Sequence, residues 1–182
     1  ADDSVARKTL RRRLDHVVLE GKDLRPLLGA SITKLRLFAL KQGLMVVIPF
    51  QIDERTPSGS YAFDKGAGTK KDVDNGAFDA NDELVFMARD SGAQAGAKIL
   101  QPYKKSVEIS LTDPKDKRKA WVYLVAFTEK DPPALSKKDY VSIKYDKNGL
   151  LTYFGHNFIT GNDRSLGNAA RTTSVRFKRS NK

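Results

Sequence analysis

The acidic segment 72–83 holds the residue types best suited to binding a metal ion. It reads DVDNGAFDANDE and places five carboxylates, two asparagines and a glycine in twelve positions. Calcium takes about six to eight oxygen ligands from carboxylates, amides and backbone carbonyls, and an aspartate pair followed by a glycine resembles the start of a calcium loop. We therefore predict a calcium site. Its candidate ligands are Asp72, Asp74, Asp79, Asp82 and Glu83, with Asn75 and Asn81 as secondary candidates.

The spacing differs from that of an EF-hand, and a metal-free interpretation is open. Counted from Asp72, the glycine is fifth rather than sixth, although Glu83 does fall at the twelfth position. In the alternative, Asp79 and Asp82 cap turns, and nearby basic residues (Lys70, Lys71 and Arg89) neutralise the other carboxylates. A bound cation would relieve carboxylate repulsion and hold the long irregular segment 53–82 in place.

Basic residues flank this acidic segment on both sides. The 182 residues include 33 Lys+Arg against 22 Asp+Glu, a net charge of +11. Such a charge attracts polyanions, and nearby aromatic rings such as Tyr103 and Phe177 could stack on sugars or bases. We interpret the basic hairpin tips first as solvated edges, and binding of a polyanion, an acidic polysaccharide rather than nucleic acid, is the alternative. The candidate contacts are Arg11, Arg12, Arg13, Lys104, Lys105, Lys117, Arg118, Arg176 and Lys178.

Catalytic motifs are missing from the sequence. Without cysteine the chain has no disulfide, thiolate zinc site, iron–sulfur cluster or cysteine nucleophile. His16 and His156 are its only histidines, and neither has a recognisable catalytic partner nearby in the sequence. Motifs of serine hydrolases and of nucleotide-binding loops are also absent. We therefore favour a non-catalytic protein. The alternative is a carbohydrate-active enzyme or its accessory domain, because two carboxylates can hydrolyse a glycosidic bond.

The elements that must position these residues are mostly short strands. Alternation over 32–39 predicts a half-buried strand, and after a turn at 41–43 the apolar run 44–50 predicts a strand buried on both faces. Pro49 places the end of that run at an edge or bulge. Two further hairpins are predicted, 107–111 with 121–127, and 141–145 with 150–154 around an Asn-Gly turn.

The remaining segments complete an all-β prediction. We expect a strand or short helix within 5–28, where helical spacing and a strand at 16–19 are both open, strands at 84–88 and 174–178, and loops at 90–98 and 161–168. About eight or nine short strands separated by turns indicate an antiparallel β-sandwich or partly open barrel with one long loop. We predict one domain over 1–182, and leave open that 1–30 form an N-terminal arm.

Two stretches carry a family resemblance. The sequences IPFQIDE, from Ile48, and FDANDELVFMA, from Phe78, resemble a pattern in exported bacterial proteins of unknown function. The pattern is also similar to a domain-of-unknown-function group attached to polysaccharide-related proteins. The resemblance covers about residues 33–92. It implies a secreted β-rich domain and brings no established activity.

The first residues of the chain favour an exported protein. A chain that begins Ala1-Asp2-Asp3 without methionine is typical of an exported protein after signal-peptide cleavage, and an experimentally chosen start is the alternative. No apolar run approaches the roughly 18 residues of a transmembrane helix. We therefore expect a periplasmic, cell-surface or extracellular β-module. It would bind a protein partner or self-associate through exposed edge strands.

Overall fold

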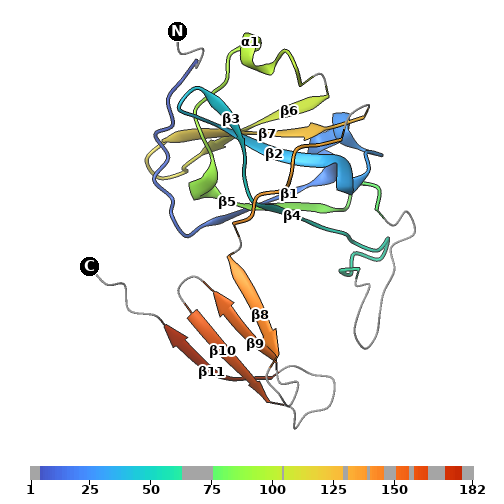
Figure 1. The fold of residues 1–182 in the computed structure, drawn as a ribbon, viewed down its shortest axis with the longest axis vertical. Coiled ribbons are helices and arrows are strands. Elements are labelled where there is room, and N and C mark those ends of the chain that lie inside the picture. Colours follow the sequence, from blue (N-terminus) through green and yellow to red (C-terminus); the bar gives the residue numbers. More distant parts are fainter. Residues whose placement is uncertain are drawn as a thin grey trace. The chain divides into compact units, whose positions relative to one another are not determined.

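The computed structural model describes residues 5–62, 76–103, 105–128, 131–138, 140–145, 151–155, 158–163 and 171–177, with the backbone alone from residue 141 onward. The sequence predicts a single domain, whereas the chain divides into two compact units, Ala1–Lys137 and Lys138–Lys182 (Figure 1). Each unit is described by itself.

The first unit consists of two antiparallel sheets. One has the strand order β1-β5-β4 and the other the order β3-β2-β7-β6. The described strands form no closed barrel, so the predicted all-β, sandwich-like fold is confirmed. The strands are β1 (His16–Glu20), β2 (Leu35–Lys41), β3 (Leu44–Val47), β4 (Phe50–Asp53), β5 (Glu83–Met87), β6 (Ser106–Thr112) and β7 (Lys119–Ala126).

Helices are few and short in the described part of the chain. The 3₁₀ helix η1 directly follows β1 and buries Leu24 and Leu27, so residues after β1 contribute to the core. No described helix has the length and apolar character needed to cross a membrane. The helices are η1 (Gly21–Leu27), η2 (Ile32–Lys34), η3 (Ala88–Asp90) and α1 (Ala97–Leu100).

The main core lies between the two sheets. Alternate residues of each strand point to the same face, which brings Leu84 and Phe86 of β5 together with Leu37 of β2 and Leu124 of β7. Phe78, from the turn before β5, is fully buried in the same cluster. Burying these side chains stabilises the unit by roughly 1.5–3 kcal/mol for each large side chain.

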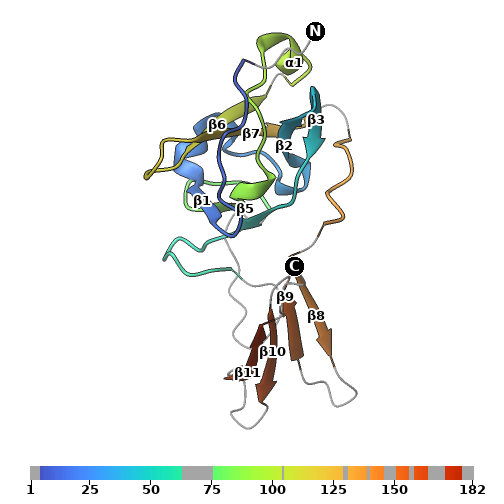
Figure 2. The same cartoon turned by 90° about the vertical axis from the view of Figure 1, so that its left-hand side faces the viewer.

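The four-stranded sheet is covered on its second face as well. Phe38 and Tyr123 pack there against Ala95, Ile99 and Tyr103 of the segment that contains α1, which lies on the side of this sheet away from β1, β4 and β5 (Figures 1 and 2). All residues of β2 except the last are therefore buried. The prediction of a half-buried strand over 32–39 is wrong, because a segment distant in sequence covers the face expected to be solvent-exposed.

The apolar run 44–50 does not form one buried strand. It divides into β3, which pairs with β2, and the start of β4, which pairs with β5 in the other sheet. Pro49 lies between the two strands, where the chain passes from one sheet to the other, and it cannot donate to either ladder. The preceding turn is confirmed. Gln42 and Gly43 both have positive φ, 51° and 78°, as a two-residue hairpin turn requires.

The second unit is a four-stranded antiparallel sheet with the order β11-β10-β9-β8. Both predicted later hairpins are confirmed, β6–β7 in the first unit and β8–β9 here. The loop expected at 161–168 is wrong in its first part, because Gly161 and Asn162 pair with β11 across a bulge. The strands are β8 (Val141–Tyr145), β9 (Leu151–Gly155), β10 (Phe158–Asp163) and β11 (Arg171–Phe177).

Candidate functional site

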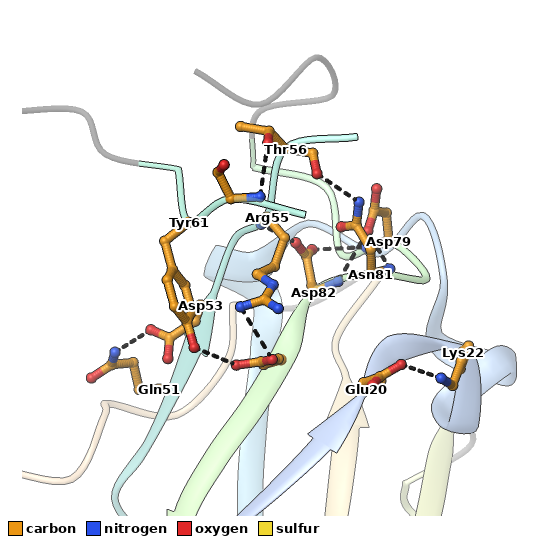
Figure 3. Close-up of polar contacts among 12 residues, drawn as sticks. Glu20, Lys22, Gln51, Asp53, Arg55, Thr56, Tyr61, Asp79, Asn81 and Asp82 are labelled. Carbon is orange, nitrogen blue, oxygen red and sulfur yellow. Dashed lines mark hydrogen bonds and ion pairs between the residues drawn. The ribbon is translucent and has the colours of Figure 1, made fainter. Parts of the chain in front are cut away.

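A polar cluster lies where β1 and β4 end and the antiparallel strand β5 begins. Glu20, Glu83 and Asp53 are cross-strand partners on these three adjacent strands. Like charges placed directly opposite each other destabilise a sheet, so each carboxylate needs a counterpart. Glu20 pairs with Lys22, and Asp53 accepts a hydrogen bond from the side-chain amide of Gln51 (Figure 3).

Of the three carboxylates, Glu83 contacts two side chains, those of Arg55 and Tyr61. Its Oε1 lies 3.4 Å from Nη1 of Arg55, and its Oε2 accepts a hydrogen bond of 3.2 Å from the Tyr61 hydroxyl. The Arg55 guanidinium carbon also lies 4.4 Å from the centroid of the Tyr61 ring, a cation–π contact. Glu83 is thus neutralised by Arg55, a residue that the sequence did not single out.

Asp79 and Asp82 cap the turn that leads into β5. Asp82 is fully buried; its Oδ1 accepts the Arg55 N–H at 3.0 Å and its Oδ2 accepts the Asp79 N–H at 2.9 Å. Asp79 Oδ1 in turn accepts the N–H groups of Asn81 at 2.8 Å and of Asp82 at 3.1 Å. The carboxylates therefore satisfy backbone donors that a tight turn would leave without acceptors.

The same turn joins two segments that are distant in sequence. The Gly21 N–H donates to the Asp82 carbonyl at 2.8 Å, and the Asn81 side-chain amide donates to the Thr56 carbonyl at 3.2 Å. A Cβ atom on Gly21 would lie 1.8 Å from the Asp79 carbonyl oxygen, so only glycine allows this approach. The acidic turn therefore connects η1 with the loop after β4 (Figure 3).

The predicted calcium ligands are only partly described. Asp72, Asp74 and Asn75 lie outside the described residues. Among the residues that are described, no group of three or more His, Asp or Glu side chains is arranged to hold a metal ion. Asn81 Oδ1 is buried and accepts no hydrogen bond from the described residues. The calcium site stays a prediction, and it depends on the undescribed part of the acidic segment.

Of the predicted polyanion contacts, Arg12 has a structural role. Its Nε and Nη2 donate to the two carboxylate oxygens of Asp113 at 2.6 and 3.0 Å. This paired hydrogen bond holds the pKa of the Asp113 carboxyl far below its ordinary value and raises the pKa of Arg12. Asp113 also accepts the Lys115 N–H at 2.9 Å, so the pair ties the N-terminal segment to the β6–β7 turn.

The other predicted basic contacts are dispersed. Arg118 pairs with Asp116 at 3.4 Å within the β6–β7 turn. The exposed members are Arg11, Arg13, Lys105 and Lys117, whereas Lys104, Lys178 and the side chain of Arg176 lie outside the described residues.

His16 lines a pocket that also contains two carboxylates. The pocket has a volume of about 500 Å³, and Arg12, Asp15 and Asp113 contribute to its wall. A glycosidase needs one carboxyl group with a raised pKa as its general acid. Here both carboxylates contact Arg12, and the pKa of Asp113 is lowered instead. The enzyme alternative gains no support from this pocket, and His156 lies outside the described residues.

A second pocket, of about 450 Å³, was not anticipated from the sequence. Its wall carries Arg7, Lys8, Lys41 and Arg89. These residues come from three segments far apart in the chain, so their positions in the sequence do not predict that they line one pocket.

No protein-family model matches the chain, and no significant match was found among curated proteins or solved structures.

Proposed function

We propose that the first unit is a non-catalytic binding module that takes up an extended segment of a protein partner at the open edge of β3. The observation that carries the proposal is the composition of this edge. β3 contains no charged residue, and its Leu44 and Val46 are 70% and 41% exposed. Edge strands are ordinarily protected from pairing with other chains by charged side chains, by proline or by a covering segment.

The other three edge strands of the unit do carry such charges. β1 ends in Glu20, β4 ends in Asp53, and β6 contains Glu108. Among the described strands β3 pairs with β2 alone. β3 is therefore the edge of this unit with the least protection against strand addition.

The register of the hairpin supplies the backbone groups for a new strand. Lys41 and Leu44 flank the two-residue turn, and Ala39 pairs with Val46. In such a hairpin the flanking pair exchanges hydrogen bonds, and bonding pairs alternate along the strand. Met45 and Val47 therefore direct their N–H and C=O groups away from β2, where an incoming strand can bond them.

Charge favours an acidic partner over a second copy. The chain carries a net charge of +11, and Lys41 lies at the end of the exposed edge, in register with Leu44. Two copies would bring like charges together, whereas a strand that alternates apolar and acidic residues would match both Val46 and the positive surroundings. An exported location and a calcium-bound loop remain parts of the proposal that rest on the sequence.

A synthetic peptide tests the proposal directly. The probe is a fluorescein-labelled, capped peptide of alternating glutamate and valine, with a lysine–valine peptide as the charge control, and binding is followed by fluorescence anisotropy. Val46→Asp should weaken binding of the acidic probe at least tenfold, because an acidic side chain repels the probe and disfavours strand pairing. The matched control is Val18→Asp, since Val18 is 43% exposed on the edge strand β1.

Three outcomes would overturn the proposal. The first is that the acidic probe fails to bind or binds no better than the lysine–valine peptide. The second is an equal loss of affinity in Val46→Asp and Val18→Asp. The third is a mass in light scattering that rises with protein concentration and returns to that of the monomer in Val46→Asp, because a second copy would then occupy the edge.

A further inference from the structure

The pocket of about 450 Å³ is lined by basic and uncharged residues. Four of its lining residues are cationic, Arg7, Lys8, Lys41 and Arg89, and none is acidic. By contrast, the wall of the pocket that contains His16 includes the carboxylates of Asp15 and Asp113.

The backbone around this pocket is fixed by contacts among three segments. Gly92 donates to the Trp121 carbonyl at 2.9 Å and accepts the Trp121 N–H at 3.0 Å. The next residue, Ala93, donates to the Leu40 carbonyl at 3.0 Å, so the segment 92–93 lies between β2 and β7. A Cβ atom on Gly92 would stand 2.2 Å from the Leu40 oxygen. The pocket is therefore bounded by closely packed, hydrogen-bonded backbone.

Lys8 holds the N-terminal segment at the pocket. Its Nζ donates to the Arg89 carbonyl at 2.8 Å and to the Ser91 carbonyl at 2.9 Å. Burial lowers the pKa of Lys8, and the positive charge of Lys41 lowers it further, while the buried Asp90 acts in the opposite direction. Lys8 and Lys41 thus repel each other across a space that an anion could occupy.

We propose that this pocket binds a tetrahedral oxyanion, a phosphate or sulfate group, carried by a sugar-sized ligand. Arginine and lysine are the side chains that recognise such groups, arginine through paired hydrogen bonds and lysine as a point charge. The volume falls within the roughly 300–1,000 Å³ of small-molecule pockets, which exceeds the need of a bare ion. The pocket adjoins the β2–β3 turn and shares Lys41 with the β3 edge. Its test uses small oxyanion probes and no peptide, so the two proposals can fail separately.

Thermal unfolding of the whole chain provides the test. It is followed by the fluorescence of Trp121, the only tryptophan, which is 6% exposed. The probes are inorganic phosphate, glucose 6-phosphate and glucose 6-sulfate, at an ionic strength held constant with sodium chloride. At a ligand concentration a hundred times its Kd, Tm should rise by about 5–10 °C. The sugar-linked probes should act at lower concentrations than inorganic phosphate, and their relative Kd values identify phosphate or sulfate as the natural group.

Two lysine variants separate binding from general salt effects. Lys41→Gln should weaken binding of the preferred probe at least tenfold. It should not lower Tm in the absence of a probe, because it removes the repulsion from Lys8. The control is Lys98→Gln, an exposed lysine that does not line the pocket. Phosphate and sulfate stabilise proteins generally through exclusion from the surface, an effect that is equal in both variants.

The proposal fails if Lys41→Gln and Lys98→Gln respond alike to all three probes. It also fails if sodium chloride of equal ionic strength reproduces the rise in Tm of the unmodified chain, since the pocket would then have no preference for an oxyanion.

Discussion

Replacing Asp82 by alanine tests the role of the acidic turn. Asp82 is fully buried and accepts the backbone N–H groups of Arg55 and Asp79, while its own carbonyl accepts the N–H of Gly21. Asp82→Ala removes both carboxylate acceptors and leaves the backbone bond to Gly21 available. The substitution therefore acts on two partly buried donors without directly removing the contact to η1.

The expected loss follows from those two donors. A buried N–H group left without an acceptor costs about 1–3 kcal/mol. Two such groups give about 2–6 kcal/mol, and water entering the space left by the carboxylate reduces the loss, so we expect about 3 kcal/mol. For a chain of this size that corresponds to a fall in Tm of about 6–12 °C. Asp79→Ala should cost only about 1 kcal/mol, because Asp79 is only partly buried and water can replace its Oδ1 as the acceptor for the two N–H groups.

Urea unfolding followed by Trp121 fluorescence measures both free energies, because this tryptophan lies in the first unit. Asp82→Asn is the conservative comparison. It retains one acceptor oxygen and places an amide group opposite the second donor, so it should lose about half as much as Asp82→Ala. A loss below about 1 kcal/mol for Asp82→Ala, or equal losses for Asp79→Ala and Asp82→Ala, would refute the reasoning.

The same titration with calcium and with EGTA tests the calcium prediction. If Asp82 is a calcium ligand, calcium stabilises the unmodified chain and this gain is absent in Asp82→Ala. An identical loss in calcium and in EGTA assigns Asp82 to turn capping alone. If EGTA leaves the unmodified chain unchanged, the calcium prediction for the whole acidic segment is wrong.

Two other substitutions should lower stability for different reasons, one steric and one electrostatic. Gly92→Ala should destabilise the first unit by about 3 kcal/mol in urea unfolding, because its Cβ would stand 2.2 Å from the Leu40 carbonyl oxygen. Gly43→Ala is the control, because Gly43 has a positive φ of 78° and no atom lies within 4 Å of the added Cβ. It should cost about 1 kcal/mol through backbone strain alone. Equal losses of stability in the two variants would contradict the steric argument. Arg12 lowers the pKa of Asp113, so the stabilisation by this pair is complete above the ordinary value of 3.8 and is lost as the pH falls below it. Urea midpoints of the unmodified chain and Asp113→Asn should therefore differ at neutral pH and converge in acid, and a difference independent of pH would show that the ionised carboxylate is not responsible.

Local sequence patterns predicted the hairpins well. The alternation over 107–111 and the Asn-Gly turn at 148–149 correctly indicated antiparallel pairs, because turn residues and period-two alternation act on neighbouring backbone. The same reasoning missed β10, since Gly161 and Asn162 are typical of loops yet pair across a bulge. A bulge needs its partner strand, which local composition does not identify.

Burial could not be predicted from the same patterns. The apolar run 44–50 suggested a buried strand, but Leu44 and Val46 are exposed because β3 is an edge with a single neighbour. The opposite error occurred at β2, whose Arg36 is buried and donates to the Pro133 carbonyl at 2.6 Å. In both strands the exposed fraction depends on which distant segment lies alongside.

The candidate site likewise has one feature that the sequence predicted and others that it did not. The residue types at 79–82 by themselves favoured the tight turn that Asp79 and Asp82 cap, since Asp and Asn supply the acceptors that turns need. Only the tertiary structure decided that Asp82 is buried against the loop after β4, and that Lys8, Lys41 and Arg89 line one pocket. Turn formation depends on a few consecutive residues, whereas the electrostatic surroundings of a side chain depend on segments that the folded chain brings together.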